Sequence, residues 1–127
     1  MKASSPKEVI ELIDKAFHAG DVESLVEMYD EAGVQVDYMG INNHREVRGR
    51  DSLRKLYSQL LQPGKYTVQQ IKSHITEADG IALFTSKWSI HTEHTEPKVY
   101  IASIVLRRQA DGSWKDLIDS SPLVLEL

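Results

Sequence analysis

Two copies of the tripeptide Ala-Asp-Gly, at residues 78–80 and 110–112, constrain the fold of this chain more than any other feature. Each copy separates two runs in which apolar and polar residues alternate, and Asp-Gly between such runs is a strong signal for a β-hairpin. The runs predict strands at Tyr66–Thr76, Ile81–Glu93, Val99–Gln109 and Ser113–Ser120. The second half of the chain is therefore predicted to be a four-strand antiparallel meander.

Two of these strands carry further information. Tyr66 and Val68 share one parity whereas Ile71 and Ile75 share the other, so we expect a β-bulge near Gln69-Gln70 that bends the sheet.

The strand that begins at Val99 is apolar on both faces. One face can pack against helices, and the other needs a second cover. We therefore expect a homodimer that packs sheet face to sheet face.

The first half of the chain shows three helical patterns. Ser5-Pro6-Lys7-Glu8 is a capping box with proline at the first helical position, and Gly20 is typical of the end of that helix. Asp21 can cap a short second helix whose inward side chains are Val22, Leu25, Val26 and Tyr29. A third helix follows Gly49 and ends before Pro63-Gly64, with an apolar stripe of Leu53, Leu56, Tyr57, Leu60 and Leu61.

A short strand is predicted at Val34–Tyr38, between the second and third helices. Helices that precede a sheet in the chain predict an α+β fold in which the helices cover one face. At 127 residues we expect a single domain, residues 1–127, and the composition excludes several functions. Without cysteine there is no thiolate chemistry or sulfur-ligated zinc site, and a net charge of −4 disfavours nucleic acid as a partner. No apolar run approaches 18 residues, so we expect a soluble, cytoplasmic protein without a membrane partner.

Three stretches of the sequence resemble the SnoaL-like, ketosteroid isomerase-like proteins of the nuclear transport factor 2-like superfamily. They are Gly20–Tyr29, Gly49–Leu53, and Leu106–Lys115 followed by Ile118–Pro122. The resemblance covers nearly the whole chain. It implies a cystatin-like cone, in which three N-terminal helices pack on a strongly bent antiparallel sheet. Members of this superfamily include isomerases, cyclases, dehydratases, epoxide hydrolases and binding modules without enzymatic activity, so the resemblance implies a fold rather than one activity.

The resemblance also places individual residues. Asp37 falls where ketosteroid isomerases carry their aspartate general base. The two oxyanion donors of those enzymes would fall at Ile13 and near Ile104, and neither side chain can donate a hydrogen bond. Because an oxyanion donor is worth about 3–4 kcal/mol in the transition state, we do not expect steroid isomerisation.

Two aspartates are candidate catalytic residues. An apolar pocket would raise the pKa of Asp37 toward working pH, but the alternation of its strand places it on the face opposite Val34 and Val36. The alternative is an aspartate at the strand end that is solvated or bonds the Asn42-Asn43 loop. Asp119 ends the last predicted strand, on the parity opposite Ile118 and Trp114. It is either a carboxylate at a pocket mouth or a partner of the closing turn.

Aromatic side chains supply the candidate ligand-binding residues. A concavity between a bent sheet and its helices can be lined by Phe17, Tyr38, Tyr57, Phe84, Trp88 and Tyr100, although core packing explains these residues equally well. The segment His91–Glu96 lacks the spacing of a metal site, so we expect neither metal nor cofactor. The basic run Arg45–Lys55 is interpreted as a solvated helix face rather than an anion site.

Two functional hypotheses follow from the sequence. The first is a pocket for a small, mostly apolar molecule, with proton transfer by an aspartate in a reaction of the isomerase, cyclase or dehydratase type. The second is a dimeric binding or interaction module without enzymatic activity, in which the pocket is filled by side chains. A large cavity that holds Asp37 or Asp119 would favour the first.

Overall fold

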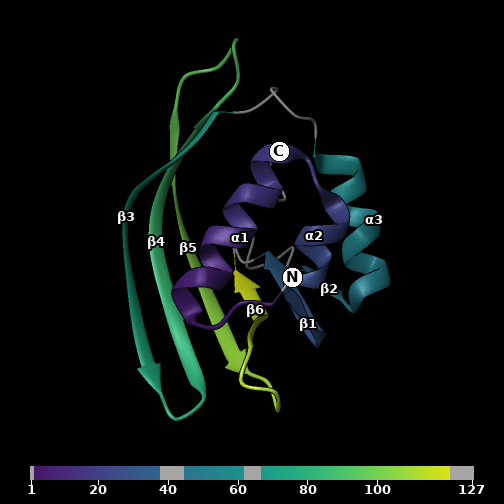
Figure 1. Ribbon diagram of the computed structural model, residues 1–127. Coiled ribbons are helices and arrows are strands. Elements are labelled where there is room, and N and C mark those ends of the chain that lie inside the picture. The colour runs from purple at the N-terminus through teal and green to yellow at the C-terminus, as the bar shows by residue number, and fades with distance from the viewer. Residues whose placement is uncertain (1, 38–44, 62–66, 121–127) are drawn as a thin grey trace.

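A computed structural model describes residues 2–37, 45–61 and 67–120. The elements follow one another as α1 (Pro6–Ala19), α2 (Val22–Glu27), β1 (Tyr29–Asp37), β2 (Arg45–Arg48), α3 (Arg50–Leu60), β3 (Thr67–Ala78), β4 (Ile81–His91), β5 (Lys98–Arg108) and β6 (Trp114–Ser120). The three helices lie on one side of a curved sheet (Figure 1). This arrangement confirms the predicted α+β class. Within the described ranges, no helix is long and apolar enough to cross a membrane.

The helix ends follow the predicted capping. The Ser5 side chain accepts a hydrogen bond from the Glu8 backbone N–H at 3.2 Å, and Gly20 ends α1 in the left-handed conformation with φ of 68°. The Asp21 side chain caps α2 by accepting from the Ser24 backbone N–H at 3.1 Å. Tyr29 is the exception, because it begins β1 instead of closing the second helix. The predicted stop at Pro63-Gly64 lies outside the described residues.

The sheet has six strands in the order β2-β1-β6-β5-β4-β3. Strands β3 to β6 form the predicted antiparallel meander. The sheet is nevertheless mixed, because β1 runs parallel to β6. The sequence did not predict β2, which pairs antiparallel with β1 through Val34 and Arg48. With four residues, of which Val47 alone is apolar, β2 is too short to show alternation.

Two irregularities in register shape the sheet. The first lies in β3 between Gln70 and Lys72, where a bulge was expected. The second lies in β6: adjacent residues of β5 pair with Asp116 and Ile118, so Leu117 is an extra residue. This extra residue changes the face on which Asp119 lies. Asp119 and Ile118 lie on different faces of the sheet, as predicted, but Asp119 shares the inner face with Trp114, which was not predicted. The bulge therefore brings Asp116 and Asp119 to one face of the sheet.

The two faces of the sheet differ in their cover. On β5, Tyr100, Ala102, Ile104 and Leu106 are buried against the helices, as the sequence predicted. The other face carries exposed large apolar residues, among them Ile81, Leu83, Val99, Ile101 and Ile118. The outer face of the described sheet is thus markedly apolar.

Candidate functional site

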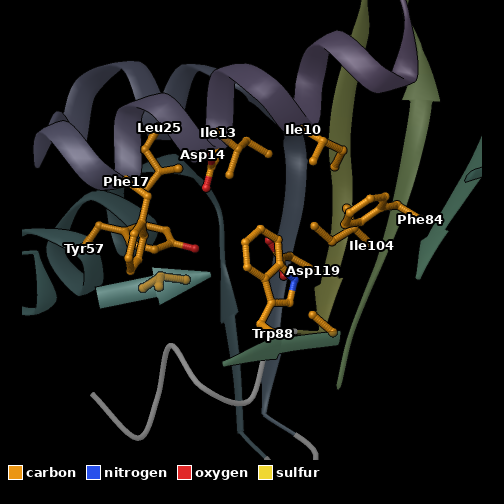
Figure 2. Close-up of a pocket in the computed structure, with 12 residues that line it drawn as sticks. Ile10, Ile13, Asp14, Phe17, Leu25, Tyr57, Phe84, Trp88, Ile104 and Asp119 are labelled. Atoms are coloured by element: carbon orange, nitrogen blue, oxygen red, sulfur yellow. The ribbon is translucent and has the colours of Figure 1, made fainter. Parts of the chain in front are cut away.

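A cavity lies between the helices and the inner face of the sheet (Figure 2). Its volume is about 80 Å³. Helices contribute Ile10, Ile13, Asp14, Phe17, Leu25 and Tyr57, and the strands contribute Val68, Phe84, Trp88, Ala102, Ile104 and Asp119. All of these except Asp14, Asp119 and the hydroxyl of Tyr57 present hydrocarbon or aromatic surface. This composition suits a small ligand that is mostly apolar.

The cavity continues into a wider groove between α1 and strands β3 and β4. The groove has a volume of about 520 Å³ and shares five lining residues with the cavity, namely Ile10, Asp14, Val68, Phe84 and Trp88. Its further lining is mostly polar and includes Lys7, Glu11, Gln70, Ser73 and His74. The cavity and the groove are therefore neighbours that share one wall.

A hydrogen-bonded chain of side chains ends at the carboxylate of Asp119. The Tyr29 hydroxyl donates to Oδ2 of Asp119 at 3.1 Å, and the hydroxyls of Tyr29 and Tyr57 lie 2.6 Å apart. Since the Tyr29 proton is directed to the carboxylate, Tyr57 donates to Tyr29. Burial raises the pKa of both tyrosines well above the usual value, and the charge of Asp119 raises it further. Both hydroxyls therefore remain protonated donors.

Asp116 lies beside this chain but does not line the cavity formed by the described residues. It is fully buried on β6, opposite Leu106 of β5 and next to Tyr29 of β1. No donor group faces either of its carboxyl oxygens, and the side chain within hydrogen-bond reach of Asp116 is that of Asp119. Burial raises the pKa of Asp116 well above the usual value, and the nearby charge of Asp119 raises it further.

Two further contacts define the cavity wall and its rim. The Trp88 indole N–H donates to the Ser86 hydroxyl, which fixes one edge of the ring. At the rim, Asp14 and His18 form an i,i+4 pair on α1, with 3.3 Å between Oδ1 and Nδ1. Asp14 is about half exposed, so it can meet a ligand that enters through the groove.

The structure places the predicted site residues as follows. Asp119 is 4% exposed and lines the cavity, together with four of the predicted aromatic residues: Phe17, Tyr57, Phe84 and Trp88. Tyr100 is buried in the neighbouring core cluster and is not among the residues that line this cavity. Tyr38 lies outside the described residues. The backbone of Asp37 pairs with Arg45 at the end of β1, and its side chain is outside the description.

The site also contains residues that the sequence analysis did not single out. These are Asp14, Tyr29 and Asp116. The i,i+4 spacing of Asp14 and His18 was the one available signal, whereas the positions of Tyr29 and Asp116 depend on the register of β1 and β6. Ile13 and Ile104, where the resemblance would place oxyanion donors, both line the cavity. At those two points the wall is hydrocarbon.

The possible metal ligands and the basic run are two further candidate regions. Among the described residues, no group of three or more histidine, aspartate and glutamate side chains is arranged to hold a metal ion. Several arginines of the basic run Arg45–Lys55 contact groups of the same chain. Arg54 pairs with Glu23 at 2.7 Å and with Asp51 at 2.9 Å, and Arg50 donates to the backbone carbonyl of Tyr29 at 2.8 Å.

Solved structures that are similar to this chain are named as different kinds of protein. The chain is similar to a candidate calcium/calmodulin-dependent protein kinase type II association domain from Thiobacillus denitrificans, with 16% identity, coverage of 95% and 96% of the two chains, and a TM-score of 0.79. A candidate ketosteroid isomerase from Parabacteroides distasonis shares 22% identity, with coverage of 91% and 85% and a TM-score of 0.73. A protein of unknown function with a cystatin-like fold from Nostoc punctiforme shares 15% identity, with the same coverage and TM-score as the second structure.

The structural similarity to these proteins shows the cystatin-like fold alone, because each shares less than 25% identity with the chain. No curated protein matches the chain at a significant level. The model of the SnoaL-like domain, in contrast, matches residues 9–117, which is most of the chain and includes every described element except part of α1 and the end of β6. The chain therefore belongs to the SnoaL-like domain family.

Proposed function

We propose that this protein binds a small, mostly apolar molecule in the cavity and that Asp119 exchanges a proton with it. The observation that carries the proposal is a nearly buried carboxylate, held by the Tyr29 hydroxyl, in a wall that is otherwise apolar. A carboxylate held in such a wall can accept a proton from a molecule bound beside it. Its fixed position also orients it toward a bound molecule.

The proposed reaction class is proton transfer of the isomerase, cyclase or dehydratase type. In its first step, Asp119 takes a proton from a C–H or O–H bond of the substrate, and the electron pair of that bond remains on the substrate. Asp119 then returns the proton to another atom of the substrate or to the leaving group. Ketosteroid isomerisation is not proposed, because Ile13 and Ile104 offer no hydrogen bond to a developing oxyanion.

Binding can be tested with benzyl alcohol, which joins an apolar ring to one hydroxyl donor. We expect perturbed amide NMR signals around Trp88 and Asp119, and weaker binding of benzoate because its charge is repelled by Asp119. Asp119→Asn should weaken the preference for the alcohol over benzoate. Asp79→Asn is the matched control, since Asp79 is exposed in the β3–β4 turn. Equal binding of both probes, or signals confined to the outer surface, would contradict the proposal.

Proton abstraction can be tested with nitrobenzisoxazole. A base removes the ring C–H proton, its electron pair completes a nitrile, and the N–O bond breaks to release a coloured phenolate. A positioned general base contributes about 10²–10⁴-fold to such a step, and we expect Asp119→Asn to remove most of that acceleration. Asp37→Asn tests the residue that the family resemblance favours. Loss of rate in Asp37→Asn with full rate in Asp119→Asn would assign the base to Asp37 instead.

The second candidate function is a dimeric binding or interaction module without enzymatic activity. It is favoured by the apolar outer face of the sheet, where Val99 and Ile101 are 58% and 59% exposed. We propose that two copies of the chain pack these faces together. Light scattering should then give twice the monomer mass, and Ile101→Lys should give the monomer mass. A monomeric wild-type protein would contradict dimerisation, and a dimer without any effect on nitrobenzisoxazole would favour the module over the enzyme.

A further inference from the structure

Asp116 is a titratable group that the proposed reaction does not use. It is fully buried, and no hydrogen-bond donor compensates either carboxyl oxygen. An ionised carboxylate in that position would have neither water nor a hydrogen-bond donor to stabilise its charge. Such a charge is among the most unfavourable groups to bury in a protein. Leu106, its partner on β5, brings no charge. The surroundings of Asp116 therefore favour the neutral acid.

Its titratable neighbours point in the same direction. They are Asp119 on β6, Tyr29 on β1 and Tyr57 on α3. The hydroxyl of Tyr29 donates to Asp119, so the hydrogen bond that stabilises a negative charge is made to Asp119 and not to Asp116. Two adjacent buried carboxyls cannot both be ionised without strong repulsion. The asymmetry of their contacts decides which one carries the charge.

We propose that Asp116 and Asp119 form a buried pair with one proton at neutral pH, in which Asp116 holds the proton and Asp119 is the ionised member facing the cavity. This inference rests on the proposed function of Asp119 as a base. Asp116 is a positioning residue, since it lies behind the cavity wall and does not touch the ligand. By staying neutral, it leaves Asp119 as a single, accessible negative charge.

The pair also sets an upper pH limit for the site. When the pH rises through the pKa of Asp116, a second negative charge appears beside Asp119 in a buried region. The folded-state pKa of Asp116 is raised, so its stabilising contribution is complete below the unfolded-state pKa and is lost as the pH rises through the folded-state value. Folding stability should therefore decline over the pH range between these two values. Asp116→Asn, which mimics the neutral acid, should remove that decline.

The decisive experiment is a carboxyl ¹³C NMR titration of the whole protein without ligand. We expect one assigned aspartate, Asp116, to show the chemical shift of a protonated acid at neutral pH while Asp119 shows that of a carboxylate. The protonated signal should be absent from Asp116→Asn. In Asp119→Asn its titration midpoint should fall, because the repulsion by Asp119 is gone, yet stay above the usual value because Asp116 is still buried.

Asp30→Asn is the matched control. Asp30 is also buried, but Arg107 and Gln109 donate hydrogen bonds to its carboxylate, so this variant should leave the protonated signal unchanged. An ionised Asp116, or a protonated signal that belongs to Asp119, would overturn the inference. The wild-type titration decides this even if Asp116→Asn does not fold. A protonated Asp116 in a protein that neither binds benzyl alcohol nor accelerates nitrobenzisoxazole would instead refute the proposed function alone.

Discussion

Replacing Tyr29 by phenylalanine tests the hydrogen-bonded chain behind the cavity. The substitution keeps the ring, which is fully buried, and deletes the hydroxyl that joins Tyr57 to Asp119. Two bonds are lost at once. Tyr57→Phe is the natural comparison, because it deletes the other hydroxyl of the same chain and leaves the bond between Tyr29 and Asp119 in place.

The two variants should differ in size of effect. A hydrogen bond to a charged group contributes about 1.5–3 kcal/mol and a neutral one about 1 kcal/mol, so Tyr29→Phe should lower the free energy of unfolding by about 2–4 kcal/mol. Part of that loss comes from leaving the buried carboxylate of Asp119 without its donor. Tyr57→Phe removes the neutral bond alone and should lower the free energy of unfolding by about 1 kcal/mol.

Urea unfolding at neutral pH, followed by far-ultraviolet circular dichroism, measures both free energies. Equal m-values of the variants would show that the same surface is exposed on unfolding. The order is the critical result: Tyr29→Phe must be the more destabilising variant. If Tyr57→Phe lowers the stability as much or more, the hydroxyl of Tyr29 does not donate to an ionised Asp119, and the assignment of charge in the site is refuted.

Three further predictions concern the frame around the site. Gly33→Ala should destabilise the fold by about 1–3 kcal/mol in urea unfolding, because its added Cβ would lie 2.8 Å from the Asp30 carbonyl oxygen and 2.9 Å from the Tyr29 ring. For Asp30, burial would raise the pKa, but hydrogen bonds that include one from Arg107 outweigh burial and lower it. The stability that Asp30 contributes is present at neutral pH and lost as the pH falls through its folded-state pKa, so wild type and Asp30→Asn should converge in acid unfolding curves. Asp21→Ala removes the cap of α2 and should lower the midpoint of thermal unfolding.

Much of the fold could be predicted because its signals are local. The side chain of Ser5 and the backbone of Gly20 each act within a few residues of the helix end that they define. The Ala-Asp-Gly turns likewise join strands that are adjacent in the chain, so alternation on each side of Gly80 and Gly112 was sufficient to predict the hairpins. In these regions, propensity, capping and hydrophobic pattern agree with one another.

The pairing of β1 could not be predicted in the same way. Its partner β6 lies more than 80 residues further along the chain, and the two strands run parallel. Neither a turn nor a short loop marks such a pairing, since it depends on how the whole sheet closes. Tyr29 was assigned to the second helix for this reason: its apolar ring continues the helical stripe, although its backbone begins a strand. The residue that holds Asp119 was therefore overlooked.

The two bulges differ in how far the sequence reveals them. In β3, apolar residues on both sides of the bulge show that the inward-facing positions change from one parity to the other, so the sequence predicts this bulge. In β6 the extra residue is Leu117, and strict alternation from Trp114 would place Asp116 inside and Asp119 outside. Because a buried, unpaired charge is so unfavourable, an aspartate at an inward-facing position suggests that the assumed alternation is wrong. Asp116 resolves that contradiction by remaining protonated, and the bulge then adds Asp119 to the same face. A shift of one residue in one strand thus creates a pair of carboxyls from two positions that regular alternation would separate.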